Sequence, residues 1–236
     1  MNDPDILQYL YGLQRFGIKM GLETIRRLCR SFDDPQDRYP CIHIAGTNGK
    51  GSTAAVLASI LREAGRRVGL YTSPHLQSFN ERIQINGVPI PENRVIALTD
   101  LLRRKLESEG DNPVTFFEFA TALSFLYFAE EAVDIAIFEV GMGGKLDATN
   151  VVHPWISLLT NVDYDHQEHL GSSLKEIALE KCAIIKEKVP LVTGETREET
   201  LSLIEKTCRE KSAPLFRVGR DFQCVAEEIG LRNMTL

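Results

Sequence analysis

The sequence has few of the features that mark secreted or nucleic-acid-binding proteins. Its five cysteines are widely spaced and include no C-x-x-C pair, so neither a disulfide framework nor a zinc site is indicated. The 27 Lys and Arg residues are outnumbered by 33 Asp and Glu and form no basic block, whereas nonspecific nucleic-acid binding needs a basic surface. A polyanionic ligand would therefore need a local positive site.

A long apolar run is also missing. The most apolar stretch, residues 116–129, is interrupted by Glu118, Thr121 and Ser124, and residues 1–5 show neither the basic region nor the apolar core of a signal peptide. We therefore expect a cytoplasmic protein without membrane contact. With 236 residues, 43% of them apolar, the chain can bury a core and form one large domain, or one domain plus part of another.

Short apolar segments alternate with helical patterns along the chain. Strands are expected at residues 41–45, 68–71, 82–85, 134–140, 155–160, 189–193 and 215–218. One or two helices are expected within 5–31, and others at 53–64, 92–109, 115–130, 172–186 and 198–211. This alternation predicts an α/β fold with a mainly parallel, doubly wound sheet that helices cover on both faces.

A glycine-rich segment, residues 43–53, lies between the first expected strand and the helix that follows it. Backbone N–H groups in such a turn, the positive end of the helix and the Lys50 ammonium together form a cradle for phosphate. The pattern departs from the general phosphate loop, because Ile44 stands where a glycine is usual and Gly51 separates Lys50 from Ser52. The alternative is a glycine-rich turn with one exposed lysine.

Polar residues of the kinds that handle phosphate and metal follow four of the expected strands. Ligands of an open parallel sheet bind beyond the carboxyl ends of its strands, so we expect these residues to meet at one edge. They are Lys50 and Ser52, Ser73, Glu139, and Asp163 with Asp165 and His166.

Glu139 is the most informative of these residues, because it interrupts an apolar strand just before a glycine cluster. A carboxylate there must be paired in a structural salt bridge or bound to a cation. Magnesium on a triphosphate prefers one or two carboxylates with hydroxyl and water ligands, which Glu139 with Ser52 or Ser73 would supply. His166 alone would be a surface loop residue, whereas beside a metal carboxylate it becomes a candidate ligand.

Lys181 occupies an unusual position in the helix expected at 172–186. It falls near the centre of an apolar stripe at about 100° per residue, so its side chain should face inward. The stripe consists of Leu174, Ile177, Ala178 and Ile185. Lys181 either extends its ammonium out to solvent along its methylene stem, or loses solvation so that its pKa falls and the neutral amine takes up carbon dioxide as a carbamate.

Taken together, these motifs resemble the folylpolyglutamate synthase/dihydrofolate synthase family of the Mur ligase superfamily. The matching stretches follow the family's order over nearly the whole chain, and the extra Gly51 is typical of that family. They are residues 45–52 (Ala-Gly-Thr-Asn-Gly-Lys-Gly-Ser), 72–76 with Glu81 and Arg82, 115–119, 139–150, Asp165 and His166 with Leu170 and Gly171, and 180–186.

The resemblance implies a role for each matching residue. It implies that Asn48, Gly49, Lys50, Gly51 and Ser52 hold the ATP phosphates and that Ser73, Glu139 and His166, with Ser52, bind Mg²⁺. Lys181 corresponds to the family's carbamylated lysine, although Cys182 and Ala183 follow it where the family has Ala-Gly. Lys50, Lys181 and His166 are the implied catalytic residues. Thr115, Phe116, Phe117 and Glu118, with Leu146, Asp147 and Ala148, resemble segments that line a pterin-substrate pocket.

The implied activity is that of an ATP-dependent acid–amino-acid ligase. Such an enzyme adds L-glutamate to dihydropteroate, to folates or to both through an acyl phosphate, and we expect it to act on small molecules as a monomer. Two alternatives are another Mur-type ligase acting on a cell-wall precursor and a regulatory P-loop ATPase. The family has a C-terminal domain that this sequence lacks, so we expect residues 1–236 to be the ATP-binding domain, incomplete at its C-terminal end. Alone, it should bind ATP weakly at best and not turn over.

Overall fold

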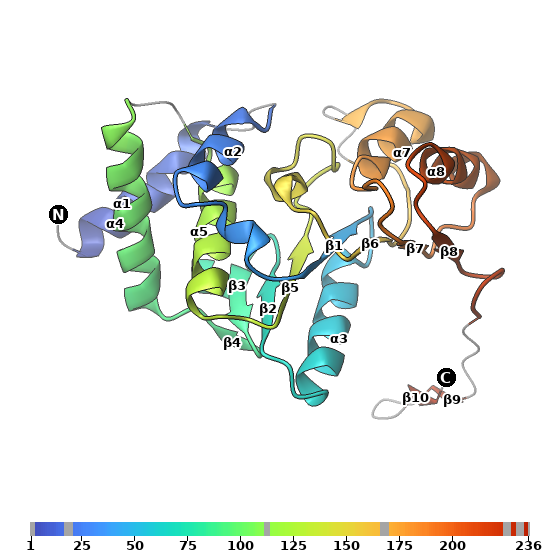
Figure 1. Ribbon diagram of the computed structural model, residues 1–236, viewed down its shortest axis with the longest axis horizontal. Coiled ribbons are helices and arrows are strands. Elements are labelled where there is room, and N and C mark those ends of the chain that lie inside the picture. The colour runs from blue at the N-terminus through green and yellow to red at the C-terminus, as the bar shows by residue number, and fades with distance from the viewer. Residues whose placement is uncertain are drawn as a thin grey trace.

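The computed structural model describes residues 3–16, 21–110, 114–165, 170–223, 228–229 and 234–235. Its centre is an eight-stranded sheet with the order β4-β3-β2-β5-β1-β6-β7-β8, in which all neighbours from β2 to β8 pair in parallel (Figure 1). The strands are β1 (Cys41–Ala45), β2 (Val68–Tyr71), β3 (Ile83–Ile85), β4 (Val88–Pro89), β5 (Ile135–Glu139), β6 (Ile156–Leu159), β7 (Leu191–Thr193) and β8 (Leu215–Arg217). The predicted mainly parallel α/β sheet is confirmed.

An antiparallel hairpin extends one edge of the sheet. β3 pairs antiparallel with β2, and β4 pairs antiparallel with β3. Asn86 and Gly87 form the turn between them with positive φ angles of 52° and 80°, a conformation that asparagine and glycine adopt most readily. A second, two-stranded antiparallel sheet consists of β9 (Glu228–Ile229) and β10 (Met234–Thr235).

Helices cover both faces of the main sheet, as the alternation of patterns predicts. In Figure 1, α3 lies below the sheet, whereas α5, α7 and α8 lie on the opposite side. The α-helices are α1 (Asp3–Gly12), α2 (Glu23–Arg30), α3 (Lys50–Glu63), α4 (Glu92–Ser108), α5 (Phe116–Glu130), α7 (Leu174–Cys182) and α8 (Glu198–Glu210). Short 3₁₀ helices are η1 (Leu13–Phe16), η2 (Pro35–Asp37), η3 (Phe79–Arg82) and η4 (Ala148–Val151). No described helix is both long enough and apolar enough to cross a membrane.

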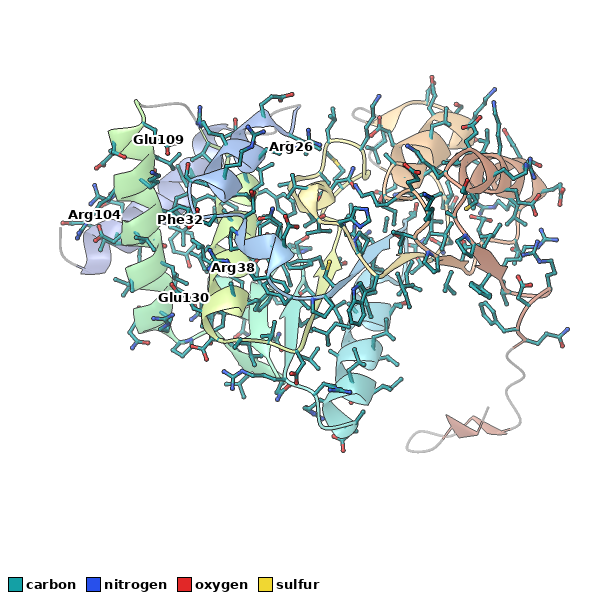
Figure 2. The ribbon with its side chains drawn as sticks, viewed as in Figure 1. Arg26, Phe32, Arg38, Arg104, Glu109 and Glu130 are labelled. Carbon is teal, nitrogen blue, oxygen red and sulfur yellow. The ribbon has the colours of Figure 1, made fainter. Side chains whose placement is uncertain are left out.

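Aromatic side chains form the core between α5 and the sheet. The Phe138 ring on β5 has its centroid 5.1 Å from that of Phe125 and 5.9 Å from that of Phe128. A Cβ atom on Gly69 would lie 2.9 Å from the Phe128 ring, so β2 needs glycine there for α5 to approach. On the outer side of this part of the molecule, Arg104 on α4 points away from the core (Figure 2).

Two helices differ from their expected bounds at the functional edge. α3 begins at Lys50 and not at residue 53, because Gly49 takes a left-handed φ of 79° and starts the helix directly after the loop. α7 ends at Cys182 and not at residue 186. The Ala183 carbonyl beyond this end accepts from Asn150 Nδ2 at 3.4 Å, a contact between distant segments that the local pattern does not reveal.

Candidate functional site

The phosphate-loop segment, residues 46–49, connects β1 to α3. Gly46 has a φ of 151°, and a Cβ atom there would lie 1.8 Å from Thr160 Oγ1. The Thr47 hydroxyl accepts from the Asp163 N–H at 2.9 Å, and the Asn48 N–H donates to Asn161 Oδ1 at 2.9 Å. These bonds fix the loop against the segment that follows β6, with the first turn of α3 directly beside it.

Two lysines meet at one carbonyl of this loop. Lys50 Nζ donates to the carbonyl oxygens of Gly46 at 3.0 Å and Thr47 at 3.1 Å. Lys181 on α7 is 1% exposed, and its Nζ donates to the same Gly46 oxygen at 2.9 Å. Burial, and then the Lys50 charge, lowers the pKa of Lys181 to about 8. The prediction that Lys181 faces inward is confirmed.

Glu139 lies at the carboxyl end of β5, between β2 and β1. It is 5% exposed, and its Oε2 accepts from the Ser73 N–H at 3.1 Å. A Cβ atom on Gly51 would lie 3.6 Å from each carboxylate oxygen, so α3 begins beside this group. Burial raises the pKa of Glu139, whereas the Ser73 N–H and Lys50 oppose the rise. No described cationic side chain lies within 4 Å of it, so the structure shows no salt bridge there.

The residues around Glu139 fit a magnesium ion that is bound mainly through phosphate. Within the described ranges, no group of three or more His, Cys, Asp or Glu side chains is arranged to hold a metal ion. Near Glu139 are instead the half-buried Ser73, which donates its N–H to the carboxylate, and Gly51, which the exposed Ser52 follows on the first turn of α3. Mg²⁺ usually takes one or two carboxylates and completes its shell with water and phosphate oxygens. His166, the other predicted ligand, lies outside the described residues.

The segment predicted to contact substrate begins α5. Glu118 Oε2 accepts from the Thr115 N–H at 2.9 Å and from its hydroxyl at 2.8 Å, which forms a capping box. The Phe116 ring packs edge-on against the Phe79 ring, with 5.8 Å between their centroids, and the centroid of the Phe117 ring lies 6.0 Å from that of Tyr71. Glu118 Oε1 is buried without a hydrogen-bond partner among the described residues.

The second predicted substrate segment, residues 146–148, is in contact with the first. A Cβ atom on Gly141, in the loop that leads into residues 146–148, would lie 2.7 Å from the Phe117 ring. Within the segment, Leu146 is half-buried, and Asp147 and Ala148 are buried. The structure therefore brings both stretches to the same side of the sheet, next to the end of β5.

Asp147 has its hydrogen-bonding capacity filled by its own loop. Its Oδ2 accepts from the N–H groups of Gly141 at 2.9 Å and Met142 at 3.1 Å. Its Oδ1 accepts from the Thr149 N–H at 2.9 Å and the Thr149 hydroxyl at 2.5 Å. Burial raises the pKa of Asp147, and these hydrogen bonds oppose the rise. The carboxylate holds the glycine loop in shape, and its contact with substrate stays a prediction.

His43 extends this network and was missed in the sequence. Its Nε2 lies 2.8 Å from Thr149 Oγ1, and because that hydroxyl donates to Asp147, His43 Nε2 carries the hydrogen. The side chain is 0% exposed, and burial, then the Lys186 charge, lowers its pKa to about 3. The available signal was a polar residue inside the apolar strand 41–45.

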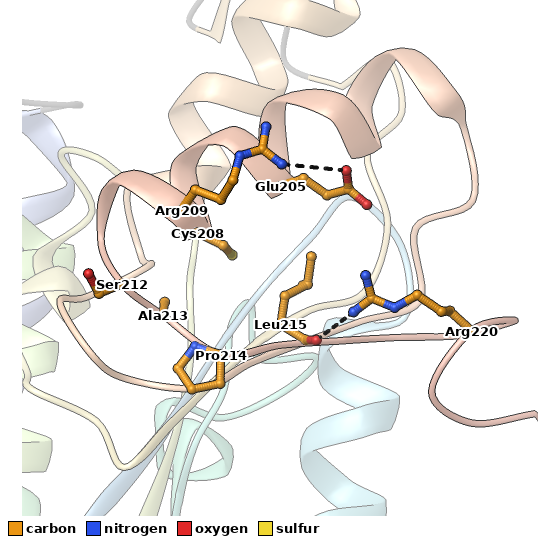
Figure 3. A pocket seen from close by; sticks show the side chains of 8 residues that line it. All are labelled: Glu205, Cys208, Arg209, Ser212, Ala213, Pro214, Leu215 and Arg220. Atoms are coloured by element: carbon orange, nitrogen blue, oxygen red, sulfur yellow. Dashed lines mark hydrogen bonds and ion pairs between the residues drawn. The ribbon is translucent and has the colours of Figure 1, made fainter.

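A pocket of about 400 Å³ lies elsewhere, between α8 and β8 (Figure 3). Arg209 pairs with Glu205 one turn earlier on α8 at 3.9 Å, and Arg220 Nη2 donates to the Leu215 carbonyl at 2.8 Å. None of the residues predicted to form the site lines this pocket. It is therefore separate from the phosphate loop.

Comparisons with known proteins identify the family of this chain. Residues 44–221 match the Mur ligase middle domain. The chain is 43% identical to the dihydrofolate synthase/folylpolyglutamate synthase of Bacillus subtilis over 89% of this chain and 50% of that protein. It is 39% identical to the folylpolyglutamate synthase of Lacticaseibacillus casei over 94% of this chain and 53% of that protein.

Solved structures give the same result. A folylpolyglutamate synthase in complex with AMPPCP superposes with a TM-score of 0.91 at 37% identity, covering 98% of this chain and 57% of that one. The enzyme of Thermotoga maritima superposes with a TM-score of 0.90 at 42% identity, covering 98% and 53%. The chain spans about half the length of the curated relatives it matches. It belongs to the Mur ligase family, in the branch of the folylpolyglutamate and dihydrofolate synthases.

Proposed function

We propose that this chain is the ATP-binding part of a ligase that adds L-glutamate to dihydropteroate, to folates or to both. The observation that carries the proposal is the meeting of Lys50, Lys181 and Glu139 around the end of β1 and β5. Complexes of similar proteins support it, since folylpolyglutamate synthase has been solved with AMPPCP and folate, and Escherichia coli FolC with DHPP and ADP.

The phosphate loop binds the nucleotide in this proposal. The N–H groups of residues 49–52 and the positive end of α3 attract phosphate oxygens, whereas the Asn48 N–H is taken by Asn161 Oδ1, so Asn48 would contact the nucleotide through its side chain. In the structure the Lys50 ammonium donates hydrogen bonds to two loop carbonyls. A bound phosphate would offer charged oxygens as acceptors in place of these neutral ones. Glu139, Ser73 and Ser52, with His166, would hold Mg²⁺, which supplies positive charge beside the transferred phosphate.

The reaction needs no protein nucleophile. A carboxylate oxygen of the acceptor attacks the γ-phosphorus, the bond to the ADP oxygen breaks, and an acyl phosphate forms. The glutamate amine then attacks the acyl carbon, inorganic phosphate leaves, and the amide remains after loss of a proton. Both steps gather negative charge on phosphate oxygens, which the Lys50 ammonium stabilises electrostatically.

Lys181 is proposed to carry a carbamate. With a pKa of about 8, a substantial fraction of its amine is neutral near that pH, which is the form that attacks carbon dioxide. The new N–C bond forms, one proton leaves, and the side chain changes from a cation to an anion. A ¹³C-bicarbonate NMR experiment tests this, with Lys181→Met as the control: a carbamate carbon resonance should appear in the wild type and vanish in the variant.

A substrate panel tests the function in the full-length protein. ADP formation with glutamate and ATP is compared for dihydropteroate, folate and a muramyl precursor. Dependence on dihydropteroate or folate is the expected result. Turnover only with the muramyl precursor would favour a cell-wall ligase, and ADP formation without any carboxylate acceptor would favour a regulatory ATPase. The cytoplasmic location and monomeric state stay predictions.

A further inference from the structure

Arg82, the last residue of η3, is a buried cation with no carboxylate partner among the residues that the structure describes. Its residue exposure is 8%, and no carboxylate oxygen of the described residues lies within 4 Å of its guanidinium. Arg103 on α4 is the contrast, because its side chain is 12% exposed and pairs with Asp100 at 2.8 Å and Glu107 at 2.5 Å. Buried charges in proteins are normally paired or bind a ligand. Among the described residues, the Arg82 charge has no such counter-ion within 4 Å.

Neutral groups hold the Arg82 side chain in place. Its Nε donates to His75 Nδ1 at 2.7 Å, and its Cζ lies 5.3 Å from the centroid of the Phe116 ring. Burial raises the pKa of Tyr71, and the hydrogen bond with Thr121 and the nearby Arg82 charge oppose that rise, so the Tyr71 hydroxyl lies near the guanidinium. The side chain is therefore oriented by a histidine, a ring and a phenol, none of which neutralises it.

The backbone places Arg82 between the two parts of the site. The Thr72 N–H donates to the Arg82 carbonyl at 3.0 Å, and the next residue, Ser73, donates its N–H to Glu139. Phe116, which the guanidinium covers, belongs to the segment predicted to contact substrate. Arg82 thus connects the proposed metal carboxylate with the proposed substrate segment.

We propose that Arg82 binds the carboxylate of the acceptor substrate and so orients it for attack on the γ-phosphate. This inference rests on the proposed function, because it takes the acceptor to be a carboxylic acid. A guanidinium presents two N–H groups in a plane, which match the two oxygens of a carboxylate. The acceptor supplies a counter-ion that the described residues do not, and His75 and Phe116 act as positioning residues for the guanidinium.

The test uses two ligands that differ only in the carboxyl group. Binding of dihydropteroate and of the same molecule with hydrogen in place of its carboxyl group is measured by fluorescence titration of the full-length protein. Loss of the carboxyl group should weaken binding to the wild type about 30-fold, a size typical of a charged hydrogen-bonded pair. It should weaken binding to Arg82→Gln by less than about 3-fold, because the interaction is already absent.

Two further variants make the test specific. Arg103→Gln removes an equally charged side chain away from the site. It should keep the ratio of the two ligands' affinities, with and without the carboxyl group, at about 30. Arg82→Lys keeps the charge but loses the planar pair of donors, so its ratio should fall to about 5. It also decides the question if Arg82→Gln does not fold, as judged by circular dichroism.

The outcomes separate this inference from the proposed function. If the wild type binds both ligands equally, or if Arg82→Gln or Arg82→Lys keeps the full ratio, Arg82 does not hold the carboxylate, although the ligase function stands. If Arg82→Gln weakens ATP binding and leaves the ratio unchanged, the guanidinium serves the nucleotide and the inference is wrong. If the wild type binds neither ligand, the proposed function fails, and the role of Arg82 fails with it.

Discussion

Glu139 and Asp147 are two buried carboxylates at opposite ends of one glycine-rich segment, with exposures of 5% and 7%. Asp147 accepts four hydrogen bonds from its own loop, whereas Glu139 accepts one, from the Ser73 N–H. Burial raises the pKa of both groups. The number of donors therefore distinguishes a carboxylate that holds the fold from one that keeps lone pairs available for a ligand.

The same comparison applies to the cations. Lys181 has three N–H groups, and among the hydrogen bonds of the described residues it donates to one acceptor, the Gly46 carbonyl, just as Glu139 accepts from one donor, the Ser73 N–H. Incomplete satisfaction of a buried charge costs stability, and proteins retain it chiefly where function requires it. The predictions below test whether satisfied and unsatisfied groups behave differently.

The largest effect is expected for Asp147→Ala. The substitution leaves the N–H groups of Gly141, Met142 and Thr149 without their acceptor, and we expect the free energy of unfolding to fall by about 4 kcal/mol. Urea denaturation measures the change. Asp147→Asn, which keeps one carbonyl oxygen, should lose about half as much. A loss below about 1 kcal/mol for Asp147→Ala would contradict the structural role of this carboxylate.

Lys181→Met should stabilise the protein at neutral pH and do so less at high pH. The folded-state pKa of about 8 lies below the ordinary value of 10.5, so between these values the unfolded chain binds more protons and stability rises with pH. Below pH 8 the full desolvation cost is present, and removing it should add about 2 kcal/mol, an advantage lost by about pH 10.5. Urea denaturation of both proteins in bicarbonate-free buffer measures this. An equal difference in the free energy of unfolding between the two proteins at neutral pH and at about pH 10.5 would refute this prediction.

Glu139→Gln should leave the fold intact and weaken the metal-dependent step. Glutamine keeps an acceptor for the Ser73 N–H and removes a desolvated charge, so unfolding should become no easier. The gain in ATP affinity on adding Mg²⁺ should fall about 30-fold, or about 2 kcal/mol. Isothermal titration with and without Mg²⁺ measures it. Asp163→Asn is the control, because Asp163 already pairs with Arg197 at 3.1 Å and should matter little.

The smallest effect is expected for Thr149→Val. The change removes the hydroxyl between His43 and Asp147 but leaves the other three bonds to Asp147, and should cost about 1.5 kcal/mol. ATP affinity should not change. Ser157→Ala, which removes another buried hydroxyl that donates to the Ile184 carbonyl at 3.0 Å, gives the background cost. A loss as large as that of Asp147→Ala would mean that the hydroxyl, not the backbone, carries the network.

Local patterns were sufficient for the features that depend on periodicity. The strands at 41–45 and 68–71 have the predicted bounds, because apolar runs between turn residues are local signals. The inward direction of Lys181 followed from helical phase. The position of Glu139 beside the start of α3 followed from the rule that ligands of a parallel sheet bind at the carboxyl ends of its strands.

Features that depend on distant segments were not predictable. The insertion of β5 between β2 and β1 is set by pairing across the sheet and leaves no mark on either strand. The four donors to Asp147 and the contact of Arg82 with His75 likewise arise only after the chain folds. Sequence alone therefore identified the charged groups but not which of them the protein satisfies itself.

The carbonyl of Gly46 gives the loop a means of reciprocal control. One oxygen with two lone pairs receives two ammonium groups, and these like charges repel each other. While Lys181 is still an unmodified amine, a phosphate that draws Lys50 away makes the proton on Lys181 more tightly held, and loss of that proton keeps Lys50 more firmly at the Gly46 carbonyl. By linkage, binding of an anion at the loop is accompanied by proton uptake at Lys181. The pH of the solution in turn changes the affinity of the loop for the anion.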